Sequence, residues 1–330
     1  MNKLLMGACL TMAMQVGHSQ TLPQLSKDPI EKIVAAMTAE EKVSLLVGTG
    51  MPGFGGQSAV VGSTQNIVPG AAGTTFPIER LGIPAIVVAD GPAGLRISPT
   101  REGNKATYYC TAFPVATLLA STWNTALVKN VGNAMGDEVK EYGCDVLLAP
   151  ALNIHRSPLC GRNFEYYSED PFVTGKLAGA MVRGIQSNNV GATVKHFALN
   201  NKETNRKNSD SRVSERAARE IYLKAFEMIV KDENPWAIMS SYNMINGYRA
   251  SESEDLLTGI LRDEWGYEGM VTSDWWTCGE HYKETKAGND LKMGNGYPDR
   301  VKKAYDKGAL SRSEMETSVK RILGLILKLD

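Results

Sequence analysis

Acidic and basic side chains stand at the ends of several apolar runs of this sequence. The run IPAIVVAD ends on Asp90, and GATVKHF carries Lys195 and His196 near its end. A third run, GMVTS, leads into Asp274 and then Trp275. Carboxylates accept hydrogen bonds from sugar hydroxyls, cations donate to them, and an indole offers a flat apolar face for a pyranose ring. These types predict a carbohydrate site in which Asp274, kept ionised by nearby cations, attacks the anomeric carbon.

Each of these residues also has an ordinary structural explanation. Asp90 could set an Asp-Gly turn, and Arg162, within GRNFEYYSEDP, could pair with Glu165 on the surface. Lys195 could pair with a carboxylate such as Glu203. A lysine at a strand end could also form a Schiff base with a carbonyl substrate, as an aldolase does. The gathering of acids, cations and aromatic rings at one edge favours sugar binding.

Repeated βα units are expected to position these side chains. Near-continuous apolar runs predict buried parallel strands over residues 83–90, 144–154, 191–197, 236–243 and 269–275. Amphipathic patterns between them predict helices over residues 122–142, 172–188, 214–232 and 254–264. Polar residues at the ends of many strands favour a barrel, because an open doubly wound sheet gathers its site at one switch point. We therefore expect an α/β fold, a single (β/α)8 TIM-like barrel.

Two capping boxes mark further helices near the ends of the chain. Thr38 with Glu41 predicts a helix restart within the helical segment 28–47, and Ser311 with Glu314 predicts the start of the last helix. Between the first of these and the first strand, GTGMPG matches the spacing G-x-G-x-x-G. This stretch follows a helix and contains a proline, so a surface loop is favoured over a dinucleotide site.

Composition and the N-terminus bound the class of protein. The 36 basic and 36 acidic residues balance, which argues against nucleic acid or an anionic membrane as a partner. Residues 1–19 have the charge, apolar run and small residues of a secretory signal peptide, so a periplasmic or extracellular location is expected. Residues 20–27 are interpreted as a leader and 28–330 as the barrel domain. No segment is long and apolar enough to predict a membrane span.

The cysteines and histidines indicate no cofactor. Four cysteines remain after the signal peptide, and none has CxxC spacing: Cys110, Cys144, Cys160 and Cys278. An oxidising compartment would permit disulfides, more than one pairing is possible, and free or singly paired cysteines are favoured. The histidines lack a metal-binding spacing such as H-E-x-x-H, so neither a metal nor another cofactor is expected.

Five stretches, taken in order, share motifs with one enzyme family: ADGPAGLR, GRNFEYYSEDP, KHFALNNKETNR, IMSSYNMINGYRA and LLTGILRDEWGYEGMVTSDWW. Together they resemble the N-terminal barrel of glycoside hydrolase family 3, in its β-glucosidase-like branch, from about residue 29 to residue 330. The resemblance implies that Asp274 is the catalytic nucleophile. To this we add the expectation that Glu203 is a partner of Lys195. It implies a −1 sugar subsite lined by Asp90, Arg96, Arg162, Lys195, His196, Arg206, Met239, Tyr242 and Trp275.

The proton donor is not evident in the chain. One-domain family members resemble KHFPGHGDT…DSH and use an Asp–His pair, whereas this chain has KHFALNNKETNR and Asp-Ser-Arg at 210–212. In the β-glucosidase-like branch, the resemblance implies a glutamate from a second α/β domain after the barrel. The chain stops at RILGLILKLD, so we expect this C-terminal domain to be absent here and to be a complementing partner. The substitutes within the chain would be Glu165, Glu169 and Glu203.

The function expected from these residues and the resemblance is that of a retaining exo-β-glycosidase, first of all a β-glucosidase. It would hydrolyse terminal non-reducing β-linked sugars of a β-glucoside or oligosaccharide through a covalent glycosyl-enzyme on Asp274. The alternative is a truncated, non-catalytic barrel that binds sugar without turning it over. Phosphorolysis, with phosphate in place of water, also stays open.

Overall fold

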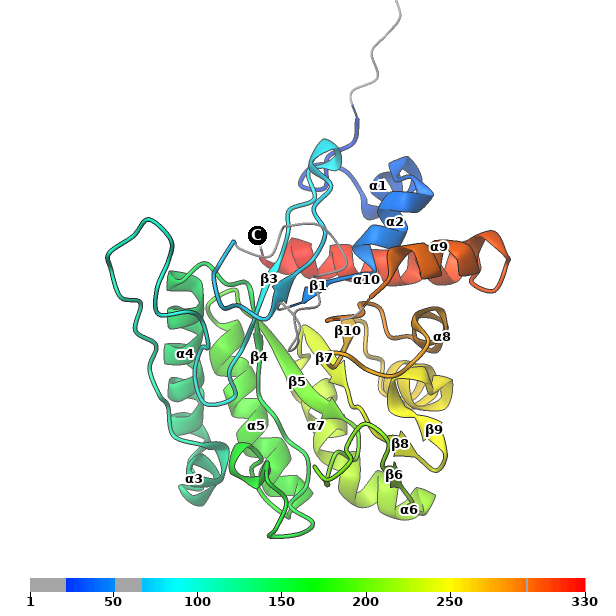
Figure 1. Ribbon diagram of the computed structural model, residues 1–330. Coiled ribbons are helices and arrows are strands. Elements are labelled where there is room, and N and C mark those ends of the chain that lie inside the picture. The colour runs from blue at the N-terminus through cyan, green and yellow to red at the C-terminus, as the bar shows by residue number, and fades with distance from the viewer. Residues whose placement is uncertain (1–21, 51–66, 295, 330) are drawn as a thin grey trace, which may run out of the picture.

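The computed structural model of the chain describes residues 22–50, 67–294 and 296–329 (Figure 1). The predicted signal peptide, residues 1–19, lies outside this part, as does the start of the predicted leader. Of the glycine-rich stretch GTGMPG only the first half is described. There, Thr49–Gly50 form a short strand, so this half is not the surface loop that the sequence predicts.

One curled sheet forms the centre of the described chain, in the strand order β1-β2-β3-β4-β5-β7-β10 (Figure 1). The strands are Thr49–Gly50 (β1), Gly73–Thr74 (β2), Val87–Asp90 (β3), Val146–Leu148 (β4), Gly191–Phe197 (β5), Ala237–Ser240 (β7) and Met270–Ser273 (β10). The last five run parallel, and each lies within one of the predicted strand runs. β2 is antiparallel to both β1 and β3. The predicted α/β fold is confirmed. The sheet forms a curled half-barrel, whereas the sequence predicts a full (β/α)8 barrel.

A second, small sheet lies after the main strand β5. In it, β8 pairs with β6 on one side and with β9 on the other. The strands are Asp210–Ser211 (β6), Met244–Ile245 (β8) and Tyr248–Arg249 (β9). β6 thus includes the Asp-Ser dipeptide at 210–211. This small sheet joins the loops that follow β5 and β7.

Helices follow most of the parallel strands. The α-helices are Ile30–Ala36 (α1), Ala39–Leu45 (α2), Ala116–Ser121 (α3), Thr125–Glu141 (α4), Pro171–Gln186 (α5), Glu215–Ala217 (α6), Lys224–Glu233 (α7), His281–Ala287 (α8), Pro298–Asp306 (α9) and Arg312–Leu329 (α10). Two π-helical segments are Ala218–Tyr222 (η3) and Asp255–Glu264 (η5), and three 3-10 turns are Glu79–Leu81 (η1), Asn163–Glu165 (η2) and Ala250–Glu252 (η4). The predicted helices correspond to α4, to α5, to α6 through α7, and to η5.

Both predicted capping boxes are present. The Thr38 hydroxyl accepts from the backbone N–H of Glu41, while the Glu41 carboxylate accepts from the Thr38 N–H at 2.8 Å. The segment 28–47 is therefore two helices, α1 and α2, divided at this box. Ser311 and Glu314 make the same reciprocal pair at the start of α10.

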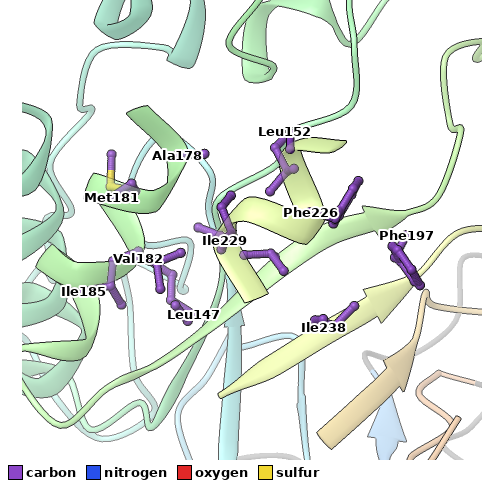
Figure 2. Packing of buried hydrophobic residues seen from close by; sticks show 14 of the residues in the cluster. Leu147, Leu152, Ala178, Met181, Val182, Ile185, Phe197, Phe226, Ile229 and Ile238 are labelled. Atoms are coloured by element: carbon purple, nitrogen blue, oxygen red, sulfur yellow. The ribbon is translucent and has the colours of Figure 1, made fainter. Parts of the chain in front are cut away.

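The main core lies between the parallel strands and the helices that cover them. Figure 2 shows Leu147 of β4 and Ile238 of β7 together with Val182 of α5 and Ile229 of α7. These side chains are fully buried, and burying an aliphatic side chain contributes about 1.5–3 kcal/mol. The close approach of α4 to α5 depends on Gly184, where a Cβ would lie 2.2 Å from a carbonyl oxygen of α4. This packing holds the strand ends in place.

A buried carboxylate ties the last helix to the sheet. Asp290 accepts from Arg262 at 2.8 Å and from Arg321 of α10 at 3.0 Å. It also accepts from the backbone N–H of Val271, in β10, at 2.8 Å. The carboxylate thus accepts from donors in three parts of the chain, which stabilises the end of the sheet next to β10.

None of the helices in the described part of the chain is both long enough and apolar enough to cross a membrane. The four cysteines downstream of the predicted signal peptide form no disulfide in the described structure. Burial raises the pKa of the Cys144 thiol to about 12, so this side chain acts as a small apolar group in the core.

Candidate active site

The carboxyl ends of the parallel strands open into one cavity of about 610 Å³. Because β3, β5, β7 and β10 run parallel, the residues at their ends lie at the same edge of the sheet. Most of the predicted site residues line this cavity: Asp90, Arg96, Arg162, Lys195, His196, Arg206, Met239, Asp274 and Trp275. Tyr242 and Glu203 do not line it: Tyr242 is buried, and Glu203 lines a different cavity.

Asp90 is held by two cations. Lys195 Nζ donates to its Oδ1 at 2.9 Å, and Arg96 Nη1 donates to its Oδ2 at 2.9 Å. Burial alone would raise the pKa of Asp90, but the charges of Lys195 and Arg96 hold it below its usual range. Asp90 is therefore an ionised acceptor at neutral pH, and its half-exposed oxygens can accept sugar hydroxyls.

Asp274 is buried, with 8% of its surface exposed, directly after β10. Its Oδ1 accepts from the backbone N–H of Trp275 at 2.7 Å, whereas Oδ2 accepts no hydrogen bond from any described residue. Burial raises the pKa of Asp274 above its usual range, and the charges of Arg162 and Lys195 offset that effect only in part. The cations expected from sequence are present, but desolvation outweighs them. A carboxylate that lines a cavity and has one oxygen free of hydrogen bonds from the described residues suits a nucleophile.

A second group of ion pairs forms the wall beside Asp274. The Glu165 carboxylate is buried and accepts from Arg162 Nε. Glu203 accepts from Arg206 Nη1 at 3.0 Å and lies 4.0 Å from Arg162 Nη1. The expectation that Glu203 partners Lys195 is therefore wrong. Of the proposed substitute acids, Glu165 and Glu203 are already bound to arginines.

The third substitute acid, Glu169, is exposed and lines a different cavity from the one that holds Asp274. None of the three therefore stands free beside Asp274. No group of three His, Cys, Asp or Glu side chains in the described ranges is arranged to hold a metal ion.

Trp275 and Tyr242 are in contact with one another next to Asp274. The indole Nε1 of Trp275 donates to the carbonyl of Ala72 at 2.9 Å, which fixes the orientation of the ring that lines the cavity. The Tyr242 hydroxyl lies close to Asp274 but donates to the Trp275 carbonyl at 2.5 Å. The guanidinium of Arg206 lies 4.7 Å above the Tyr242 ring. Tyr242 thus binds the backbone that follows Asp274.

Several buried residues of the site were not predicted from the sequence. Asn153, with 1% of its surface exposed, binds the backbone of His196 on both sides. The Tyr166 hydroxyl contacts Nδ1 of His196, and Asn200 Nδ2 donates to that hydroxyl. Tyr166 belongs to the motif GRNFEYYSEDP, so that motif was a signal for it. Asn153 carries no comparable signal, because an asparagine in an apolar stretch resembles any loop residue.

Comparison with known proteins gives matches over most of the chain. Residues 63–325 match the Glycosyl hydrolase family 3 N terminal domain. The chain is 56% identical over 290 residues to "Beta-glucosidase A" of Butyrivibrio fibrisolvens, which covers 88% of this chain and 32% of that protein. It is 42% identical over 256 residues to "Exo-alpha-(1->6)-L-arabinopyranosidase" of Bifidobacterium longum, covering 76% of this chain and 34% of that protein.

Among solved structures, the chain is similar to that of beta-glucosidase 3B from Thermotoga neapolitana in complex with alpha-D-glucose. The TM-score is 0.87 and the sequence identity 50%, over 91% of this chain and 43% of that chain. The chain spans about a third of the length of the curated relatives that it matches.

Proposed function

Because the chain belongs to glycoside hydrolase family 3, we propose that it carries the part of a retaining exo-β-glycosidase that binds a terminal sugar and attacks it. The observation that carries this proposal is Asp274, a carboxylate that lines the same cavity as an ionised Asp90 and several cations and has one oxygen that accepts no hydrogen bond from the described residues. The relatives named as β-glucosidases make β-glucosides the first substrate class to test.

The reaction follows from these groups. A carboxylate oxygen of Asp274 attacks the anomeric carbon, the bond from that carbon to the aglycone oxygen breaks, and the aglycone leaves with a proton from an acid. Water then attacks the same carbon from the opposite face, gives up a proton and releases Asp274, so the anomeric configuration is retained. Asp90, Lys195 and Arg96 would hold the sugar hydroxyls throughout.

The acid is proposed to be a glutamate of a second domain in the whole protein. This part of the proposal is supported by the binding of Glu165 and Glu203 to arginines and by the position of Glu169 in another cavity. It also agrees with the length of the curated relatives, of which this chain spans about a third. A complementing C-terminal domain would then be the natural partner of this chain.

The sugar at the −1 subsite is proposed to be glucose, with arabinose as the competing candidate. The second candidate rests on the relative named as an exo-α-(1->6)-L-arabinopyranosidase, which is 42% identical over 256 residues. Nitrophenyl β-glucoside and nitrophenyl α-L-arabinopyranoside, compared at equal concentration, would separate the two.

Trapping of the covalent intermediate tests the catalytic proposal directly. A dinitrophenyl 2-deoxy-2-fluoro-β-glucoside should label the chain once, and peptide mass spectrometry should place the label on Asp274. Asp274→Asn should take no label, while Asp263→Asn, which changes an exposed aspartate, should be labelled as the wild type is. Label on any other residue would refute the assignment.

Leaving-group dependence tests the missing acid. The chain alone should cleave dinitrophenyl glucoside far better than cellobiose, because an activated phenol departs without protonation. Normal enzyme rates on both substrates would contradict an absent acid. Glucose binding without label or turnover would instead establish the alternative function, a non-catalytic sugar-binding barrel.

The half-barrel is further proposed to close into a TIM-like ring through the backbone of Leu291 and Lys292. In support, Leu291 forms a parallel bridge with Thr272 of β10, and Lys292 forms one with Val47, just before β1. Lys292 N donates to the carbonyl of Leu46 at 3.0 Å. If the ring closes, the amide hydrogens of residues 291 and 292 should exchange as slowly as those of β7. Fast exchange there would argue for an open edge.

Secretion is proposed from the sequence of residues 1–19. N-terminal sequencing of the protein from its native host should show cleavage near residue 19, with the mature chain outside the cytoplasm. An intact N-terminus in the cytoplasm would refute this proposal.

A further inference from the structure

His196 is enclosed at the base of the cavity, with 2% of its surface exposed. Its two ring nitrogens face different groups. Nε2 lies 3.8 Å from Oδ2 of Asp274, the oxygen that accepts no hydrogen bond from the described residues. Nδ1 lies 3.4 Å from Oδ1 of Asn153 and 3.3 Å from the hydroxyl of Tyr166. The position of the single ring proton therefore decides what His196 presents to the nucleophile and to a sugar.

The Asn153 amide is oriented by the backbone of His196. Its Nδ2 donates to the His196 carbonyl at 2.9 Å, and its Oδ1 accepts from the His196 N–H at 3.0 Å. A flipped amide would place donor against donor and acceptor against acceptor. Oδ1 must therefore face Nδ1, and it can accept from this nitrogen but cannot donate to it. Only Tyr166 can supply a proton to an unprotonated Nδ1.

The Tyr166 hydroxyl has one hydrogen to donate and two acceptors within reach. Asn200 Nδ2 donates to its oxygen at 3.2 Å, so the hydroxyl hydrogen must point elsewhere. The Asn200 carbonyl lies at 3.4 Å and His196 Nδ1 at 3.3 Å. The rings of Tyr166 and His196 meet edge to face, with centroids 6.3 Å apart. These distances permit either acceptor, so charge must decide between them.

The charge of Asp274 makes the difference. Burial, together with the charges of Arg162 and Lys195, holds the pKa of His196 well below its usual range, so the ring is neutral and carries one proton. If that proton were on Nδ1, the lone pair of Nε2 would face the carboxylate oxygen of Asp274 and repel it. With the proton on Nε2, an N–H dipole faces the same oxygen and is attracted to it.

We propose that Tyr166 is a positioning residue, which donates its hydroxyl hydrogen to Nδ1 of His196 and so holds this ring in the tautomer with the proton on Nε2. The Nε2–H group then points into the cavity beside Asp274 and can donate to a bound sugar hydroxyl. Asn200 completes the arrangement, because its amide holds the Tyr166 oxygen and also donates to Glu203 at 3.2 Å. The tautomer of His196 thus depends on a side chain that lines no part of the cavity.

Nitrogen-15 NMR of the full chain labelled on histidine tests this proposal without any turnover. The signals of His196, assigned by their loss in His196→Gln, should show a protonated Nε2 and an unprotonated Nδ1. Tyr166→Phe removes only the hydroxyl and should shift these signals toward a mixture of tautomers. Tyr167→Phe is the matched control, because it removes the hydroxyl of the adjacent buried tyrosine of the apolar core, and it should leave the signals unchanged.

A proton on Nδ1 in the wild type would overturn the proposal, and so would signals that do not respond to Tyr166→Phe. The wild-type spectrum decides even if the variant fails to fold. The consequence for reactivity rests on the proposed glycosidase function: Tyr166→Phe should react about tenfold more slowly with the fluoroglucoside than Tyr167→Phe does. A chain that takes no label but shows the Nε2–H tautomer would refute the glycosidase proposal while supporting this one.

Discussion

Replacing Asp274 by asparagine should make the folded chain more stable at neutral pH. The substitution keeps the shape of the side chain and the oxygen that accepts from the Trp275 N–H at 2.7 Å. It removes a buried negative charge whose other oxygen accepts no hydrogen bond among the described residues. It also removes the attraction of that charge to Arg162 and Lys195, so the net effect depends on which contribution is larger.

The direction of the pKa shift answers that question. Burial raises the pKa of Asp274 despite the nearby cations, so the ionised form is less favourable in the folded chain than in water. A buried polar group left without a partner costs about 1–3 kcal/mol. Since the lost attraction to the cations cancels part of this, we expect Asp274→Asn to gain about 1–2 kcal/mol. For a chain of this size that corresponds to about 2–8 °C in Tm.

The gain should depend on pH in a defined direction. An aspartate in the unfolded chain titrates near about pH 3.9, and the folded pKa of Asp274 lies above that. Between the two pKa values the folded state binds more protons than the unfolded state, so wild-type stability falls as pH rises through this window. The difference between variant and wild type should therefore be small at the acid end, grow through the window and level off above it.

Urea unfolding of wild type and Asp274→Asn at a series of pH values would measure this difference. Asp263→Asn is the matched control, because it changes an exposed aspartate and should shift stability little at any pH. Asp274→Asn that is less stable than wild type at pH 7 would show that attraction to the cations outweighs desolvation. A gain that does not vary with pH would show that the charge is not its cause.

Three further changes probe the packing and the sugar site. Gly184→Ala should lower the free energy of unfolding by about 1–3 kcal/mol in urea, since the added Cβ would lie 2.2 Å from a carbonyl oxygen. Gly324→Ala is the control, because a Cβ there meets open space and should cost no stability. Equal losses in the two variants would count against close helix packing. Asp290→Ala should lower the free energy of unfolding by about 3–5 kcal/mol, measured as a loss of Tm, because it leaves the Arg262 charge buried without its partner. A loss below about 1 kcal/mol would contradict this role of Asp290. Lys195→Met should weaken glucose binding by about 10–100-fold in calorimetric titration, and an unchanged Kd would remove this lysine from the sugar site.

Much of the fold and site could be predicted from local patterns. The apolar runs around Asp90 and Asp274 are continuous because their strands are buried on both faces, and a polar residue at the end of such a run marks the edge of a sheet. The two capping boxes are equally local, since each depends on residues three positions apart. The half-barrel itself was less accessible, because the antiparallel strands β1 and β2 are only two residues long.

The partners of the site residues were not predictable in the same way. Lys195 could have paired with Glu203, eight positions away, but it pairs with Asp90, 105 positions away. The hydrogen bond between Asn153 and the His196 carbonyl joins residues 43 positions apart in the sequence. Such choices depend on which strands become neighbours in the sheet.

The sequence by itself determined which chemical groups stand at the strand ends of this protein, because strand and helix patterns are local properties of the chain. Only the tertiary structure decided how these groups are charged and bound. Desolvation of Asp274 depends on every residue that excludes water from it, and no local pattern records that sum. The same holds for the proton of His196, whose position depends on Tyr166, from the loop before α5, and on Asp274, from the end of β10.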